Sequence, residues 1–122
     1  MTLKEALQMK KRPKYGNHRI KTPDGDFDGE AEYGHWLELK LLQMAGGITD
    51  LQRQVPFVLI PSQRGSDGKV IEQPVKYIAD FVYTENGGTV VEDVKGYKTP
   101  EYIIKRKLML KVHGIRIKEV EV

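Results

Sequence analysis

Residues 77–95 read YIADFVYTENGGTVVEDVK, two apolar runs joined by a turn signal. Asn86-Gly87 tolerates the positive φ angles that a tight two-residue turn requires. The runs on either side are rich in Val, Tyr and Phe, which favour strands. The stretch therefore predicts a β-hairpin whose long strands lie near the centre of a sheet.

Acidic residues fall at matching places on the two predicted strands. Side chains alternate faces along a strand, so Asp93 and Lys95 project side by side while Glu92 faces the other way. Counting outward from the turn, Asp80 lies opposite the Glu92–Asp93 pair. Converging carboxylates repel each other unless a proton or a cation lies between them, and oxygen ligands without cysteine suit Mg²⁺ or Mn²⁺. Alternatively, Asp93 and Lys95 simply neutralise each other at a sheet edge.

Upstream of the hairpin, the pattern predicts a helix over residues 28–45 and a strand over 54–61. Asp28 is suited to cap the helix and Gly46-Gly47 to end it. Glu32 lies one turn into the helix and could point over the strand ends toward Asp80, or it is an exposed glutamate. His35 could face the same mouth. Helical spacing predicts a packed apolar stripe of Tyr33, Leu37, Leu41 and Met44.

Downstream, residues 69–83 and 89–95 complete the three hairpin-linked strands, and a second helix follows. Thr99 offers a capping hydroxyl, Pro100 suits the first helical position, and Glu101 places an acid in the first turn. This helix ends at His113-Gly114, and residues 115–122 alternate apolar and charged side chains as a last strand. The sequence thus predicts an α/β fold with the order αβββαβ, a mixed sheet and a parallel last pairing.

Length and composition set the limits. A chain of 122 residues, 39% of them hydrophobic, makes one compact domain. The absence of cysteine excludes disulfides and thiolate zinc sites. Neither a secretory signal nor a membrane-spanning apolar run is visible in the sequence, which favours a soluble intracellular protein with no membrane partner.

Positive charge gathers in two segments. Residues 1–22 hold seven Lys and Arg against one acid, and residues 95–118 hold eight against one. We interpret residues 1–22 as a basic arm with a short helix between Leu3 and Pro13, and residues 23–122 as the folded domain. The arm docks on this domain, on a second subunit or on nucleic acid. The two segments predict a polyanionic partner, although solvated surface charge explains them equally well.

Several segments resemble the PD-(D/E)XK nuclease superfamily, and in particular small phage-encoded members of unknown function. The superfamily pattern is a glutamate on the first helix, an acid on the second strand and Asp-x-Lys on the third. Here these are Glu32, Asp80 and Asp93-Val94-Lys95. The sequence departs from the pattern at Ala79, where a proline is usual, and at Gly29-Glu30-Ala31, where Ser-Lys-x is expected. The resemblance covers residue 14 to the end, through FDGEAEYGHWLELKLLQMAGGI, LQRQVPF, YIADFVY, VVEDVKGYKTPEYIIKRKLM and HGIRIKEV.

The resemblance implies metal-dependent hydrolysis of phosphodiester bonds. By it, Asp80, Asp93 and the Val94 carbonyl bind Mg²⁺, for which Mn²⁺ is a plausible substitute, and Glu32 binds a second ion or a metal water. Lys95 positions the attacking hydroxide and stabilises charge on the phosphate. Gln54 lies near the scissile phosphate. The expected catalytic set is thus Glu32, Gln54, Asp80, Asp93 and Lys95.

The expected partner is DNA, bound through its phosphates by basic residues of the arm and the second helix. Compact members of the superfamily resemble Holliday-junction resolvases, so we expect a dimeric enzyme selective for branched DNA, acting in phage recombination or replication inside a bacterial cytoplasm. Two alternatives stay open: a non-cutting DNA-binding accessory on this fold, or a nicking or restriction-type nuclease on linear duplex. The candidate DNA-binding residues are Lys10, Lys11, Arg12, Lys14, Lys98, Lys105, Arg106, Lys107 and Lys111.

Overall fold

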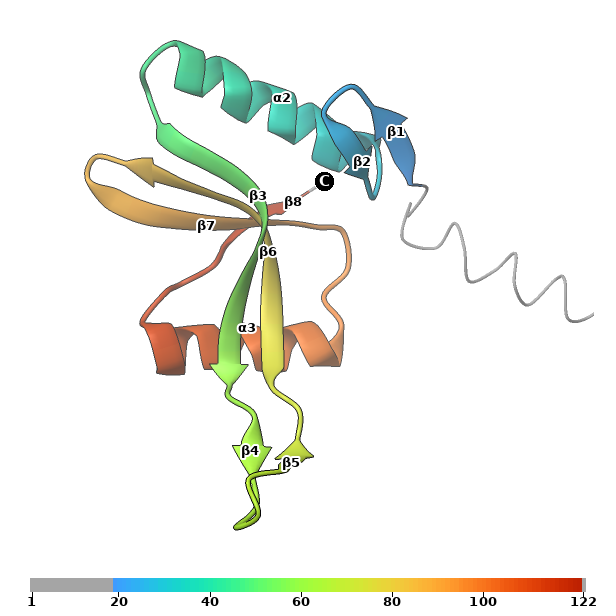
Figure 1. Cartoon of the computed structure of the whole chain (residues 1–122). Helices are drawn as coiled ribbons and strands as arrows, with labels where there is room; N and C mark the ends of the chain where they lie inside the picture. Colours follow the sequence, from blue (N-terminus) through green and yellow to red (C-terminus); the bar gives the residue numbers. More distant parts are fainter. Residues whose placement is uncertain (1–18, 122) are drawn as a thin grey trace, which may run out of the picture.

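A computed structural model describes residues 19–121 of the chain (Figure 1). Its main sheet has the strand order β3-β6-β7-β8, in which β7 and β8 run parallel and the other pairs antiparallel. These strands are β3 (Thr49–Ile60), β6 (Val75–Glu85), β7 (Gly88–Lys95) and β8 (Lys118–Glu121). Two small hairpins are added, β1 (Ile20–Thr22) with β2 (Gly25–Phe27), and β4 (Gln63–Arg64) with β5 (Val70–Glu72). The two helices are α2 (Glu30–Met44) and α3 (Pro100–His113).

The mixed α/β class and the parallel last pairing are both confirmed. Helix α3 begins where its signals indicate, because the Thr99 hydroxyl accepts a hydrogen bond from the Tyr102 N–H, and it ends at Gly114 with a φ of 67°. The single strand expected over residues 69–83 is wrong in detail: it is divided into β5 and β6 around Pro74. Proline has no N–H to donate, so it interrupts a continuous ladder.

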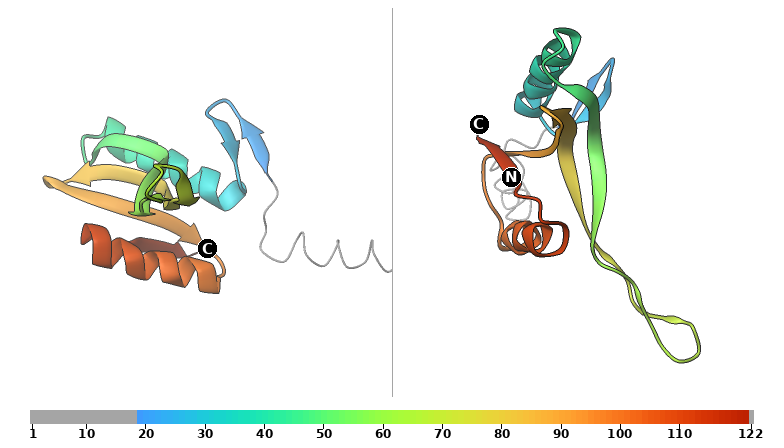
Figure 2. Two further views of the ribbon diagram at one scale, coloured as in Figure 1. Left: turned by 60° about the horizontal axis from the view of Figure 1, so that its bottom comes forward. Right: turned by 90° about the vertical axis from the view of Figure 1, so that its left-hand side faces the viewer.

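The helices lie on opposite sides of the sheet, which gives three layers (Figure 2). Between the sheet and α3 lies a core of Leu59, Tyr77, Ala79, Val91, Tyr102, Met109 and Ile117. On the α2 side a second core holds Phe27, Leu39, Ile48, Phe81 and Tyr83. Neither described helix has the length and hydropathy needed to cross a bilayer.

The expected packed stripe of the first helix is wrong. Leu41 is 65% exposed and Met44 82% exposed, whereas the buried residues of α2 are Glu32 and Leu39. Between them, Trp36 packs against Phe81 with ring centroids 5.8 Å apart. The buried face therefore carries charged and aromatic groups, which an apolar repeat does not reveal.

The β1–β2 hairpin packs against the start of α2. Phe27 is buried, and its ring centroid lies 5.0 Å from that of Tyr33. The Asp24 carboxylate accepts hydrogen bonds from Trp36 Nε1 and Lys40 Nζ, both at 3.1 Å. The boundary that we drew between residues 22 and 23 thus cuts through this hairpin. The short helix expected within the arm lies outside the described residues.

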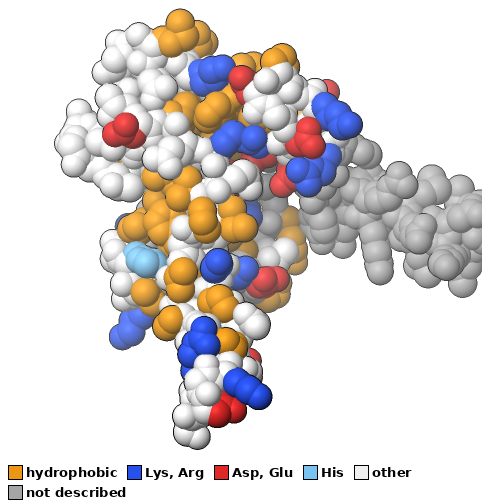
Figure 3. Space-filling model, viewed as in Figure 1, with side chains coloured by type: hydrophobic (Ala, Val, Ile, Leu, Met, Phe, Trp, Pro, Cys, Tyr) orange, Lys and Arg blue, Asp and Glu red, His pale blue; other side chains and the backbone are white. Residues whose placement is uncertain are grey.

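Beyond the end of their contact with β7, strands β3 and β6 continue alongside α3 as a two-stranded ribbon that leads to β4 and β5 (Figures 1 and 2). Apolar side chains remain exposed along this ribbon, including Ile71 at 68% and Ile78 at 54%. Hydrophobic side chains are exposed across the middle and lower part of the molecule in Figure 3. Strand β3 also carries Gln54, and β6 carries Asp80, so the ribbon begins at the predicted site.

Candidate functional site

The predicted site lies where β6 and β7 separate. Their ladder runs from Glu85 and Gly88 at the turn to Phe81 and Glu92, and it stops there. The next two residues in register are Asp80 and Asp93. In place of a backbone pair, Asp80 Oδ2 accepts a hydrogen bond of 2.8 Å from the Val94 N–H. The Asp80 carboxylate therefore occupies the fork between the two strands, beside Asp93.

Lys95 lies next to Asp93, as the strand alternation predicts. Its Nζ is 2.9 Å from Asp93 Oδ2. The same ammonium lies 4.2 Å from the centre of the Tyr102 ring, which belongs to the first turn of α3. An anionic neighbour on one side and an aromatic face on the other hold the ammonium over the fork.

Glu32 reaches the site from α2, where it is 6% exposed. Its Oε2 accepts a hydrogen bond of 2.9 Å from the backbone N–H of Asp28. The expected capping by Asp28 is therefore wrong: Gly29 is the N-cap, with no side-chain cap, and Glu32 instead reaches back to the N–H of the residue before the N-cap. This bond fixes the direction in which the carboxylate points.

Gln54 joins Glu32 to Asp80. Its Nε2 donates long hydrogen bonds to Glu32 Oε1 at 3.4 Å and to Asp80 Oδ1 at 3.5 Å. Gln54 has a φ of 55°, which is unusual for a non-glycine residue within a strand and costs about 1–2 kcal/mol. Its neighbours Arg53 and Val55 pair with Phe81 and Ala79, so the strained residue lies directly opposite Asp80.

Glu32, Asp80 and Asp93 form a row of acids that is desolvated and crowded. Burial raises the pKa of Glu32 to about 7, the Asp28 N–H opposes the rise, and the neighbouring Asp80 adds to it. Burial and the nearby Asp93 raise the pKa of Asp80 to about 7, against the stabilising Val94 N–H. Such perturbed acids are typical of functional sites, because a fold gains nothing by crowding carboxylates without a ligand.

The row of acids suits one hard cation and does not form a ready-made cage. Among residues 19–121, no three His, Asp or Glu side chains are arranged to hold a metal ion by themselves. However, Asp93 Oδ2 is buried and accepts no hydrogen bond from any described residue, since the Lys95 ammonium lies outside hydrogen-bonding geometry. Mg²⁺ is commonly held by one or two carboxylates together with waters and substrate phosphate. The donors present fit that ion.

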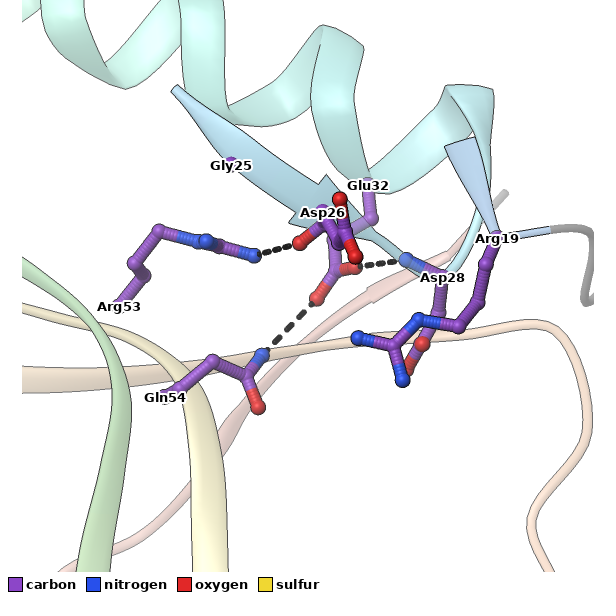
Figure 4. A pocket seen from close by; sticks show the side chains of 7 residues that line it. All are labelled: Arg19, Gly25, Asp26, Asp28, Glu32, Arg53 and Gln54. Carbon is purple, nitrogen blue, oxygen red and sulfur yellow. Dashed lines mark hydrogen bonds between the residues drawn. The ribbon is translucent and has the colours of Figure 1, made fainter. Parts of the chain in front are cut away.

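A polar pocket of about 540 Å³ opens beside Glu32 and Gln54 (Figure 4). The β1–β2 hairpin forms one wall of the pocket. Arg53, from β3, is held against this wall by a 2.5 Å hydrogen bond from its Nη2 to the Asp26 carbonyl. The Arg53 guanidinium also lies 3.7 Å from the centre of the Phe27 ring. Sequence reasoning missed this pocket, although Arg53 is the immediate neighbour of Gln54.

The candidate DNA-binding residues divide into three groups. Three are paired with acids: Lys98 with Glu121, Lys105 with Glu101, and Arg106 with Glu119. Lys107 and Lys111 are exposed on α3 and form no ion pair with a described residue. The arm residues Lys10, Lys11, Arg12 and Lys14 lie outside the described residues.

His35 does not join the acids at the fork. It contacts Glu92, which faces α2 and is only 1% exposed. His35 Nε2 lies 2.5 Å from Glu92 Oε1, the Tyr83 hydroxyl donates to Glu92 Oε2, and Lys118 Nζ lies 3.5 Å from the same oxygen. Helix α2 is thus tied to β7 one residue before Asp93 and one helical turn after Glu32.

Replacing Glu92 with alanine is expected to lower the free energy of unfolding by about 3 kcal/mol, because Tyr83 and His35 lose a buried partner. Urea denaturation followed by circular dichroism measures the change. The exposed Glu72→Ala in β5 is the matched control, with a change within about 0.5 kcal/mol. Equal small effects in the two variants would contradict the assigned role of Glu92.

Comparison with known families shows to which family the chain belongs. The profile of DUF1064, a family described as proteins of unknown function, matches residues 12–120. The chain therefore belongs to this family. No curated protein matches it in sequence.

Proposed function

We propose that the protein is a Mg²⁺-dependent endonuclease of the PD-(D/E)XK type that hydrolyses DNA phosphodiester bonds. One observation carries the proposal: Glu32, Gln54, Asp80, Asp93 and Lys95 come from four separate elements and meet in one row at the fork of β6 and β7. Carboxylates beside a lysine suit the hydrolysis of a phosphodiester, since a cation held by the carboxylates and a proton-bearing ammonium can both face the phosphate.

The roles follow from the contacts. Asp80 and Asp93, with the Val94 carbonyl, would hold Mg²⁺ or Mn²⁺, and the ion when bound supplies a water of lowered pKa and neutralises charge on the phosphate. Lys95 would donate to a phosphate oxygen from its place between Asp93 and the Tyr102 ring. Gln54 orients Glu32 and Asp80 through its amide.

Structure-selective cleavage of branched DNA in phage recombination or replication, by a dimer inside the bacterial cell, is the finer part of the proposal. Purified protein incubated with labelled junction, flap, single-stranded and linear duplex DNA, with Mg²⁺ or EDTA, tests it. We expect Mg²⁺-dependent cuts in the branched substrates. Equal cutting of linear duplex would indicate a restriction-type enzyme, and binding without cleavage of any substrate would indicate an accessory protein.

Lys107 and Lys111 are the basic residues of α3 that remain free to meet phosphates among the described residues. Replacing both with alanine is expected to weaken DNA binding regardless of sequence and to reduce the slope of log affinity against log salt by about 2, because two fewer counterions are released. Fluorescence anisotropy at several salt concentrations measures this slope.

Lys69→Ala, in the loop between β4 and β5, is the control for the α3 substitutions. We expect it to leave the salt dependence unchanged. If the slope falls for Lys69→Ala and not for the α3 double variant, the DNA path runs along the ribbon and our assignment to α3 is wrong.

A further inference from the structure

The pocket beside the acids differs chemically from a groove for the phosphate backbone. Asp26 and Asp28 line it with exposed carboxylates, and neither carboxylate bonds to another described side chain. Carboxylates repel phosphates, so a surface that only follows a DNA backbone has no use for them. They are hydrogen-bond acceptors that remain open to an N–H donor from a ligand.

The other lining groups suit the remaining parts of a nucleotide. Arg19 forms no ion pair with any described residue, and Figure 4 shows it lining the pocket on the side of Asp28, opposite Arg53. Arg53 presents a planar group that Phe27 and the Asp26 carbonyl already hold in place. A guanidinium plane is a surface on which a base stacks, and a free arginine binds phosphate.

Size and position select among ligands. A volume of about 540 Å³ is within the range of small-ligand sites and holds a single nucleotide. The pocket also borders Glu32 and Gln54, and the Gln54 amide donates hydrogen bonds to both Glu32 and Asp80. A nucleotide seated here is therefore adjacent to any phosphate bound at the fork.

We infer that this pocket receives one unpaired nucleotide next to the scissile phosphate. The inference rests on the proposed function and specifies its substrate class: DNA in which a base beside the cut is free of its partner, as at a branch, flap or single-stranded end. Asp26 and Asp28 accept from the exocyclic amino group of the base, as carboxylates do from cytosine. A paired base has this edge occupied and remains stacked in the duplex.

Titration of the ¹⁵N-labelled full chain with deoxycytidine 5′-monophosphate, followed by amide chemical shifts, tests the inference without any cleavage. We expect shifts in residues 25–28 and 53–54, and at least tenfold weaker binding of 2-deoxyribose 5-phosphate, which lacks the base. The Asp26→Ala/Asp28→Ala variant should lose this tenfold preference and bind the sugar phosphate at least as tightly as the wild type. Glu85→Gln, at the distant β6–β7 turn, is the control and should keep the preference.

The outcomes separate this inference from the proposed function. If the enzyme cuts DNA but the nucleotide and the sugar phosphate bind equally, the nucleotide pocket is wrong and the nuclease assignment stands. If the nucleotide binds as described but no DNA is cut, the nuclease assignment fails and the pocket stands. Equal affinities of wild type and the double variant for the nucleotide would also overturn the pocket.

Discussion

Replacing Asp93 with asparagine is expected to lower the rate of DNA cleavage by about 1,000-fold or more while DNA affinity is kept. Asp93 has a buried carboxylate oxygen to which no described residue donates a hydrogen bond. A divalent ion bound there would supply the missing partner. Loss of an ion that neutralises transition-state charge removes several kcal/mol of stabilisation. Single-turnover cleavage of a labelled junction in Mg²⁺, with anisotropy for binding, measures both quantities.

The exposed Glu85→Gln serves as the matched control for charge removal and should cleave at the wild-type rate. Circular dichroism of Asp93→Asn must show a folded protein for the comparison to count. Retention of more than half of the wild-type rate by both Asp93→Asn and Asp80→Asn would place the catalytic centre elsewhere.

Replacing Asp80 with asparagine is expected to raise the free energy of unfolding by about 2–3 kcal/mol at pH 8 in EDTA. Burial and the adjacent Asp93 raise the pKa of Asp80 to about 7, so its charged form destabilises the fold. Asparagine removes the charge, keeps the shape and still accepts the Val94 N–H. Urea denaturation of both proteins, with one buffer series over pH, gives the difference.

The pH dependence has a definite sign. Below about pH 3, Asp80 is mostly protonated in the folded and the unfolded states, so the two proteins should be equally stable apart from other effects of the substitution. As the pH rises toward 7, the unfolded state ionises and the folded state resists, so the wild type loses stability relative to Asp80→Asn. A constant difference between the proteins from pH 4 to 8, or a less stable variant at pH 8, would contradict this assignment.

The fork was predictable from sequence because it depends on local rules. Asn86-Gly87 sets the hairpin register, which places Asp80 opposite the Glu92–Asp93 pair, and strand alternation places Lys95 beside Asp93. The capping signals of α3 and the parallel return of β8 are equally local or topological. These predictions need only spacing along the chain, and the structure agrees with them.

The packing of α2 was not predictable in this way. Apolar periodicity predicts a packed stripe that ends at Leu41 and Met44. Both residues are exposed, because the inner face of the helix includes Glu32 and His35. Glu32 is buried and His35 is partly buried, and partners from distant strands bond to them: Gln54 to Glu32, and Glu92 to His35. A pattern of hydrophobicity contains no information about such partners.

The pocket and the β1–β2 hairpin were not predictable from the sequence either, because both depend on tertiary contacts. The predicted basic arm, residues 1–22, includes β1, yet β1 pairs with β2, and Phe27 at the end of β2 buries its ring against Tyr33 and Arg53. That contact brings Asp26 to the pocket, from a segment in which the sequence predicts no site residue. The backbone conformation of Gln54 was likewise not predictable. It is left-handed and aims the amide at two acids, and no sequence pattern indicates it.

The central claim is that a divalent ion binds at the fork, and anomalous diffraction from crystals soaked in Mn²⁺ tests it most directly. Our account predicts a strong peak within about 2.3 Å of one carboxylate oxygen each from Asp80 and Asp93, with the Val94 carbonyl as a further ligand. Crystals of Asp93→Asn treated in the same way should lack that peak. A wild-type fork without bound manganese, or manganese bound only elsewhere on the protein, would contradict the account.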